Sequence, residues 1–217
     1  MTEFTLHCFA ESGNAYKTAL MLELCGANWT PHRIAFFTGE TRRPEFRAVN
    51  VMGEAPVLVH HREGGDFTLS QSGAILTYLA RRLGKFGPKD EAQEYEILRW
   101  LLWDNHKFTS YTATTRFMDF FMKKGDAPET EFLRARAVSA WKVLETHLTG
   151  RDWIVGDEPT IADLSVCGYL FWPQQIGMDR AQYPAITAWL NRIAALPGWK
   201  SPEALMPTGQ EEKSATA

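Results

Sequence analysis

The chain has 217 residues and a formal net charge of -3 at neutral pH. Hydrophobic residues make up 45% and charged residues 23%, a balance typical of a folded protein with one large domain or two small ones. The charge gives no reason to expect a nucleic acid or an anionic membrane as a partner. No apolar run is long enough to span a membrane, and the N-terminus lacks the blocks of a secretion signal, so we expect a cytoplasmic protein.

Cysteine and histidine spacing argues against a metal or disulfide site. Cys8, Cys25 and Cys167 form no Cys-x-x-Cys pair, so we expect them to be reduced and to belong to the core, with a redox role for Cys8 as the alternative. The six histidines show no two-His or His-carboxylate spacing that would predict a metal ion.

The first elements predict a βαβ unit. Residues 4–9 alternate as a strand does, and residues 14–25 carry leucines at mostly helical spacing, with Gly26 placed to end the helix. A second strand is predicted around residues 33–36, parallel to the first.

A hairpin and a helix follow. The predicted strands cover residues 57–59 and 67–69, joined by a turn at 63–66. The helix after them has an apolar stripe that ends near Leu83, with Gly84 in the position of a C-terminal cap. Residues 1–84 therefore read as one α/β domain of βαβ-ββα order.

The rest of the chain is predicted to be helical. After a linker at residues 85–90, an all-α domain is expected over 91–206, and Thr160 to Asp163 resembles a capping box. The expected helices are 91–124, 129–149, 160–176 and 182–195. Residues 207–217 are polar and without pattern, and are expected to be loose.

Three short segments together indicate a site for a peptide with a thiol. Pro56 begins an apolar strand, and the peptide bond between Ala55 and Pro56 can adopt the cis form. Such a turn leaves the backbone groups of Ala55 free to pair with an extended ligand. The helix start at Ser72 supplies N–H groups and a dipole that suit a carboxylate. Ser12, after the first strand, would meet the reactive end of the ligand.

The order and spacing of these segments resemble a cytosolic glutathione S-transferase over nearly the whole chain. The resemblance implies a thioredoxin-like glutathione-binding domain, a helical domain that contributes the electrophile site, glutathione as co-substrate without a metal, and a homodimer. The run from Ser12 to Lys17 is similar to the serine-type bacterial and fungal members. It implies that Ser12 and Asn14 are the catalytic residues.

The resemblance also implies the contacts to glutathione. Ala55 and Pro56 would meet its backbone, and Gln71 and Ser72 its γ-glutamyl end. Gln71 lacks the formal charge that a glutamate in this position offers to the ligand's ammonium group. The loop before residue 45 would supply a basic contact for the glycine carboxylate, with Arg42 and Arg43 both open as the residue.

The predicted electrophile site lies on the helices of the second half, and each of its residues has a structural alternative. Aromatic residues at helical spacing are by default core, and charged residues are by default solvated. The predicted residues are Trp103, His106, Lys107, Tyr111 and Trp172.

The predicted function is conjugation of glutathione to small hydrophobic electrophiles, as in detoxification. Glutathione-dependent reduction of peroxides or disulfides is the alternative within enzymes, because Asn14 matches an asparagine that some relatives use for such chemistry. A ligand-binding protein with this fold and no turnover is the alternative outside enzymes.

Overall fold

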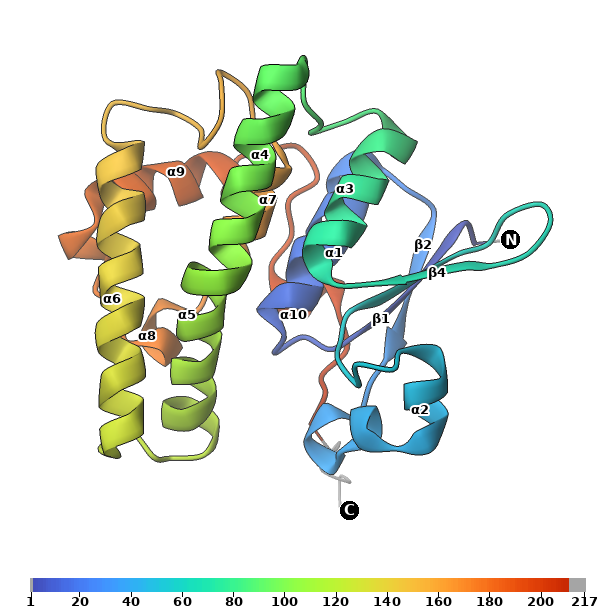
Figure 1. The fold of residues 1–217 in the computed structure, drawn as a ribbon, viewed down its shortest axis with the longest axis horizontal. Coiled ribbons are helices and arrows are strands. Elements are labelled where there is room, and N and C mark those ends of the chain that lie inside the picture. Colours follow the sequence, from blue (N-terminus) through green and yellow to red (C-terminus); the bar gives the residue numbers. More distant parts are fainter. Residues whose placement is uncertain (1, 211–217) are drawn as a thin grey trace. The chain divides into compact units, whose positions relative to one another are not determined.

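The computed structural model describes residues 2–210 (Figure 1). The chain forms two compact units, one of residues 2–79 with residues 200–210, and one of residues 80–199. The first unit holds a four-stranded sheet and the second is helical. The predicted order of an α/β part followed by an all-α part is confirmed.

The sheet of the first unit has the strand order β2-β1-β3-β4. Strand β1 is parallel to β2 and antiparallel to β3, which is antiparallel to β4. This is the predicted βαβ-ββα arrangement of a thioredoxin-like fold. Its elements are β1 (Phe4–Cys8), α1 (Gly13–Cys25), β2 (Trp29–Arg33), α2 (Pro44–Val49), β3 (Val57–His60), β4 (Phe67–Ser70) and α3 (Ser72–Leu83).

The side chains of β1 point alternately to the two faces of the sheet. Phe4, Leu6 and Cys8 point to one face and are fully buried; on this face Phe4 packs on His60, which is hydrogen-bonded to Tyr78 of α3. Val57 points to the opposite face, where it packs with Phe46 of α2. The sheet is thus covered on both faces, and the segments that carry Ser12 and Ala55 adjoin the ends of its two central strands, β1 and β3.

The second strand lies earlier in the chain than predicted. β2 covers Trp29–Arg33 and not residues 33–36. It is an edge strand whose three central residues are all exposed, so it has no apolar alternation to read from the sequence. Ile34 and Phe36, which suggested the strand, lie just beyond it and join the apolar cluster around Phe9.

The predicted helix over residues 91–124 ends at Phe121 and is interrupted by two π turns. A π turn is wider than an α turn and rotates the side chains that follow it. The carboxylate of Asp104 is fully buried at the first π turn and accepts hydrogen bonds from Thr109 (2.6 Å) and Ser165 (2.5 Å). The segments are α4 (Glu91–Trp103), a π turn (Asp104–Phe108), α5 (Thr109–Arg116) and a second π turn (Phe117–Phe121).

The predicted helix over residues 160–176 is also broken. It divides into α7 (Ile161–Val166), a 3₁₀ turn (Cys167–Tyr169) and α8 (Pro173–Ile176). Proline disfavours a helical conformation in the residue before it, and Trp172 has left the helical region, with φ -118° and ψ 59°. The break therefore has a local cause at Pro173.

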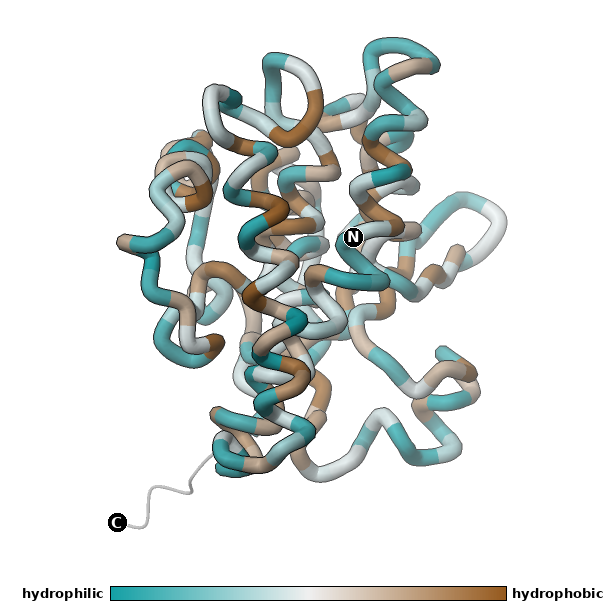
Figure 2. The backbone as a smooth tube through the Cα atoms, turned by 60° about the vertical axis from the view of Figure 1, so that its left-hand side comes forward, coloured by the Kyte–Doolittle hydropathy of each residue, from teal (hydrophilic) through white to brown (hydrophobic). Residues whose placement is uncertain are grey.

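The two remaining helices agree with the prediction to within two residues. They are α6 (Pro128–Leu148) and α9 (Pro184–Ala194). Along the helices the tube in Figure 2 changes repeatedly between brown and teal, as expected for helices with one apolar and one polar face. Within residues 2–210, no helix combines the length and the apolar character needed to cross a membrane.

The start of α7 carries the predicted capping box. Thr160 Oγ1 accepts from the N–H of Ala162 (3.2 Å), and Asp163 Oδ2 accepts from the N–H of Thr160 (2.8 Å). Asp163 also accepts from the N–H of Ile154 (2.9 Å) and from Trp189 Nε1 (2.8 Å). Burial raises the pKa of the Asp163 carboxyl, and these donors oppose the rise. This carboxylate joins α7, α9 and the loop before them.

The end of the described chain returns to the first unit, whereas the predicted helical domain extends to residue 206. Helix α10 (Pro202–Leu205) packs on α1. The N–H of Ala10 donates to the carbonyl of Pro207 (2.7 Å), and the N–H of Gly209 donates to Glu11 (2.9 Å). Residues 207–210 are therefore held in place, in contrast to the loose tail expected from residue 207, and residues 211–217 lie outside the described part.

Burial controls the chemistry of the cysteine nearest to the predicted site. None of the three cysteines forms a disulfide in the described chain. Cys8 is fully buried, and this burial raises the pKa of its thiol to about 12. The thiol therefore stays protonated at neutral pH, which favours the core role over the redox alternative.

This burial predicts that iodoacetamide at mildly alkaline pH leaves Cys8 unmodified in the native protein, because only an accessible thiolate reacts. The half-buried Cys25 is the internal comparison and should react first. Mass spectrometry of peptides from native and urea-unfolded protein measures both. Rapid labelling of Cys8 in the native protein would contradict the buried, protonated thiol.

Candidate active site

Ser12 lies at the junction between β1 and α1 and is 6% exposed. It is the N-cap of α1, with φ -91° and ψ 110°, and its Oγ accepts a hydrogen bond from the N–H of Ala15 (3.1 Å). A hydroxyl that accepts in this way still carries a hydrogen to donate. Within the described chain that hydrogen has no acceptor, so the geometry leaves it for a ligand.

Asn14 and Ser72 come together although 58 residues separate them. The hydroxyl of Ser72 donates to Asn14 Oδ1 (3.3 Å), which joins the first turn of α1 to the start of α3. Because the amide oxygen of Asn14 accepts this bond, its NH₂ group is turned to other partners. The structure thus places the first and third predicted segments at one site.

The middle segment supplies backbone groups. The Ala55–Pro56 bond is cis, and Pro56 leads directly into β3. Ala55 makes no hydrogen bond to any described residue, so its N–H and carbonyl are open to an extended ligand. Just before it, Gly53 has φ +66°, and a Cβ there would lie 2.9 Å from the carbonyl oxygen of Thr41. Only glycine fits this approach.

Gln71 has a strained backbone and an acidic neighbour. Its φ of 70° lies in the left-handed region, which costs a residue other than glycine free energy. The side-chain amide donates to Glu54 Oε2 (2.9 Å) and contacts Met52 Sδ (3.1 Å). Glu54 is a residue that the sequence analysis missed. A single carboxylate in a loop carries no signal in the sequence. Its contact with Gln71 is seen only in the structure, where Gln71 has a positive φ.

The basic residues of the α2 region remain alternatives. Arg42 closes a 3₁₀ turn and Arg43 is the N-cap residue of α2, and both side chains are exposed. Arg47 is a third residue that the sequence analysis missed. A Cβ built on Gly53 would lie 3.4 Å from the guanidinium carbon of Arg47, which places this charge beside the loop to Ala55.

The residues predicted for the electrophile site divide between core and surface in the helical unit. Trp103 packs on Trp100 and Phe108, with ring centroids 5.0 and 5.3 Å apart. Trp172 is 6% exposed and lies under the guanidinium of Arg116, 4.0 Å from the ring centroid.

The polar members of this set lie on the interrupted helix. His106 and Lys107 belong to the first π turn, where His106 is exposed and Lys107 is half-buried. Tyr111 is half-buried on α5. The π turn rotates these residues away from the positions that a continuous α-helix would give them.

Residues 2–210 contain no group of three or more histidine, cysteine or acidic side chains placed to hold a metal ion. The groups around Ser12 are hydroxyls, amides, backbone donors and one carboxylate. This combination is suited to binding a zwitterionic peptide and to donating a hydrogen bond to a sulfur atom.

Comparison with known proteins identifies both units. The model of the glutathione S-transferase N-terminal domain matches residues 3–81, and that of the C-terminal domain matches residues 106–197. The glutathione S-transferase-like protein LUC7 of a Fusarium species is 32% identical, over 86% of each chain. The disulfide-bond oxidoreductase YfcG of Escherichia coli is 29% identical, over 87% of this chain and 89% of its own.

A solved structure shows the same fold. A glutathione transferase family member of Pseudomonas fluorescens, crystallised with two glutathione bound, has a TM-score of 0.79 and 27% identity, over 90% of this chain and 89% of its own. With the two domain models and the Fusarium relative, this establishes that the chain belongs to the glutathione S-transferase family.

Proposed function

We propose that this protein activates the thiol of glutathione at Ser12 and transfers the thiolate to a small hydrophobic electrophile. The main support for this proposal is the geometry of the Ser12 hydroxyl. Its oxygen accepts a hydrogen bond at the start of α1, and its hydrogen remains available to donate. On this proposal the protein is a serine-type member of its family, and Ser12 stays unmodified during turnover.

The size of the effect required is within reach of such a donor. A free thiol has a pKa of about 8.5, and lowering it by about 2 units requires about 2.7 kcal/mol of preferential stabilisation of the thiolate. A hydrogen bond to a charged group contributes about 1.5–3 kcal/mol. The amide NH₂ of Asn14 and the N-terminal end of α1 add to this stabilisation.

The rest of the peptide has a partner for each group. The backbone of Ala55 next to Pro56 pairs with the cysteinyl part, and the start of α3 at Ser72 receives the γ-glutamyl carboxylate. Arg42 receives the glycine carboxylate, with Arg43 and Arg47 as alternatives. The two glutathione molecules bound to the Pseudomonas fluorescens structure support glutathione as the ligand.

Glu54 supplies the negative charge that the neutral side chain of Gln71 lacks. Its carboxylate lies 2.9 Å from the Gln71 amide, so the pair offers one formal negative charge and one amide oxygen to the ammonium group of the γ-glutamyl residue. We therefore add Glu54 to the glutathione-binding residues. Because Glu54 is exposed, its contribution is that of a screened surface charge.

Reduction of disulfides with glutathione is the second candidate function. The Escherichia coli relative is named as a disulfide-bond oxidoreductase, and Asn14 in the first turn of α1 matches an asparagine that some relatives use for such chemistry. Both reactions begin with the same thiolate. They differ in the partner that the thiolate attacks, a carbon in conjugation and a sulfur in reduction.

Ser12→Ala should return the pKa of bound glutathione toward its free value, because the donor to the thiolate is lost. The same change removes the cap of α1 and costs about 1 kcal/mol of stability. Ser12→Gly separates the two roles, since glycine is tolerated at an N-cap at a cost of a few tenths of a kcal/mol. Thiolate absorbance across a pH titration gives the pKa of each variant.

If both variants keep a depressed thiol pKa and full turnover, Ser12 has no role in activation. An unshifted pKa in the unaltered protein would instead favour the ligand-carrying alternative. Product analysis then separates the two reactions, because conjugation yields a thioether and reduction yields oxidised glutathione while a disulfide or peroxide is consumed.

Glu54→Gln should weaken glutathione binding about two- to fivefold, as expected for a screened ion pair. The matched ligand is glutaryl-cysteinylglycine, which lacks only the ammonium group and should bind both proteins equally. Glu63→Gln, an exposed glutamate in the turn between β3 and β4, is the control variant. Calorimetric titration measures the affinities. Equal losses for both ligands would rule out a contact between Glu54 and the ammonium group.

We further propose that two copies of the chain pair through α4, in the cytoplasm, where such an enzyme would serve detoxification. Tyr95, Leu98 and Leu102 form an exposed apolar stripe on this helix, with 62, 45 and 61% of each residue accessible. Family resemblance and this stripe support a homodimer.

Leu98→Glu places a charge in the middle of the stripe and should shift the protein from dimer to monomer in sedimentation equilibrium. The unaltered chain should sediment at about twice the mass of one copy. A monomeric unaltered protein, or a variant that stays dimeric, would contradict pairing through α4.

A further inference from the structure

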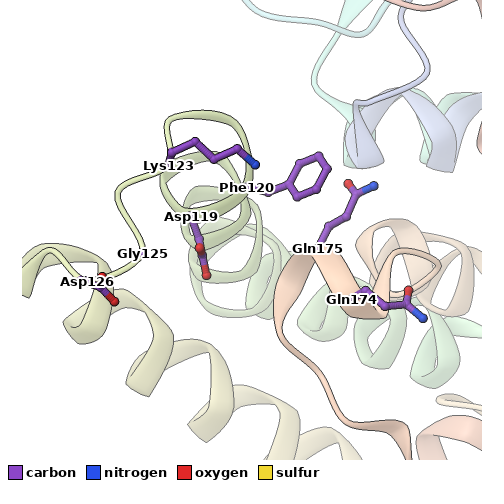
Figure 3. Close-up of a pocket in the computed structure, with 7 residues that line it drawn as sticks. All are labelled: Asp119, Phe120, Lys123, Gly125, Asp126, Gln174 and Gln175. Carbon is purple, nitrogen blue, oxygen red and sulfur yellow. The ribbon is translucent and has the colours of Figure 1, made fainter.

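The helical unit contains a polar pocket that none of the predicted site residues lines. It has a volume of about 310 Å³ and lies between the second π turn, the loop after it and the start of α8 (Figure 3). We call it the α8 pocket. This volume is at the lower end of the range for small-molecule sites.

One wall of the α8 pocket is fixed by close contacts around Asp119. Arg134 Nη2 donates to Asp119 Oδ2 (2.9 Å) and to the carbonyl of Gly125 (3.2 Å). A Cβ on Gly125 would lie 2.6 Å from Asp119 Oδ1, so a larger residue would displace this carboxylate. The wall is therefore held from two sides, and the charge of Asp119 is compensated by Arg134.

The opposite wall contains an amide whose orientation is determined. Arg116 is 2% exposed and donates from Nε (2.9 Å) and Nη2 (2.5 Å) to Gln175 Oε1. The guanidinium also stacks on the ring of Trp172. Because both bonds require the oxygen of the amide, the NH₂ group of Gln175 is left as a donor. It has no partner among the described residues.

Two opposite charges complete the α8 pocket. The ammonium group of Lys123 lies 4.7 Å from the centre of the Phe120 ring, which separates it from the Gln175 amide in Figure 3. Asp126 lies on the other side, with Asp119. Within residues 2–210, neither Lys123 nor Asp126 has an ion-pair partner. The charge that Asp119 brings is already compensated, so one cation and one anion are available to a ligand.

We propose that the α8 pocket binds a short zwitterionic peptide. Its carboxylate is received by the Lys123 ammonium, its ammonium group by Asp126, and an apolar side chain by the ring of Phe120, with the Gln175 amide as a further donor in the opposite wall. A peptide suits this arrangement better than a single amino acid, since the cationic and anionic groups of the pocket lie on different sides of it (Figure 3). The site contains neither Ser12 nor any residue of the glutathione proposal.

The probe is the dipeptide glycyl-L-phenylalanine, titrated against the full chain and followed by saturation-transfer NMR. Lys123→Gln and Asp126→Asn should each weaken its binding about two- to fivefold, because each removes one exposed charged partner. Lys142→Gln, an exposed lysine on α6, is the matched control and should change nothing. Thermal midpoints of all variants verify that they are folded.

Two modified probes assign the charges. N-acetylation of the dipeptide removes its ammonium group and should abolish the effect of Asp126→Asn, whereas amidation of its C-terminus should abolish the effect of Lys123→Gln.

The thiol site is tested separately with Ser12→Ala, which should bind the dipeptide as the unaltered protein does even if thiol activation is lost. The inference is overturned if the dipeptide does not bind, if the three probes bind alike, if both charge substitutions leave binding unchanged, or if Ser12→Ala abolishes it.

Discussion

The hydrogen bond from the N–H of Ala15 to Ser12 Oγ is the constraint on which the candidate site depends. Helix α1 is buried along most of its length, so water does not satisfy the orphan N–H groups at its start. A side-chain oxygen has to do so, and this fixes the rotamer of Ser12. The structural role and the proposed chemical role therefore use different parts of one hydroxyl, the oxygen for the helix and the hydrogen for the ligand.

The same constraint extends to the start of α3. Ser72 donates a hydrogen bond to Asn14, so side chains join the first turns of α1 and α3. The hydrogen bond between Gln71 and Glu54 connects the loop from Gly53 to Pro56 with the start of α3. Each element is short and polar. Their combined geometry is set by the buried sheet beneath them, which supplies the rigidity that loops alone lack.

Sequence patterns predicted the elements whose burial follows a simple period. The strand at Phe4–Cys8 alternates cleanly, and the helix beginning at Ser72 has an apolar stripe, so both were found close to their observed bounds. Strand β2 was misplaced because its register is set by pairing with β1 at the sheet edge, where Trp29 lies opposite Phe4. No property of an exposed edge strand reveals this in the sequence.

The candidate site was predictable to a different extent in each unit. Cap residues and helix starts are local signals, and the structure brings two of the residues predicted from them, Asn14 and Ser72, into contact. Glu54 was missed because its contact depends on the left-handed backbone of Gln71. In the helical unit, the first π turn depends on tertiary contacts such as that between Asp104 and Ser165, 61 residues apart, so helical spacing alone does not predict where the side chains after it point.

The aromatic residues of the helical unit show why an apolar stripe is a poor guide to a ligand's polarity. Phe108 and Trp172 are buried, and the ring of Trp172 carries the guanidinium of Arg116. A buried cation requires such compensation, and here the aromatic ring and the Gln175 oxygen provide it. The apolar residues thus stabilise a polar arrangement, and the hollow that results is lined by an ammonium, carboxylates and amides. The polarity of this hollow is therefore set by tertiary contacts such as those of Arg116, and hydrophobicity along the helix does not report it.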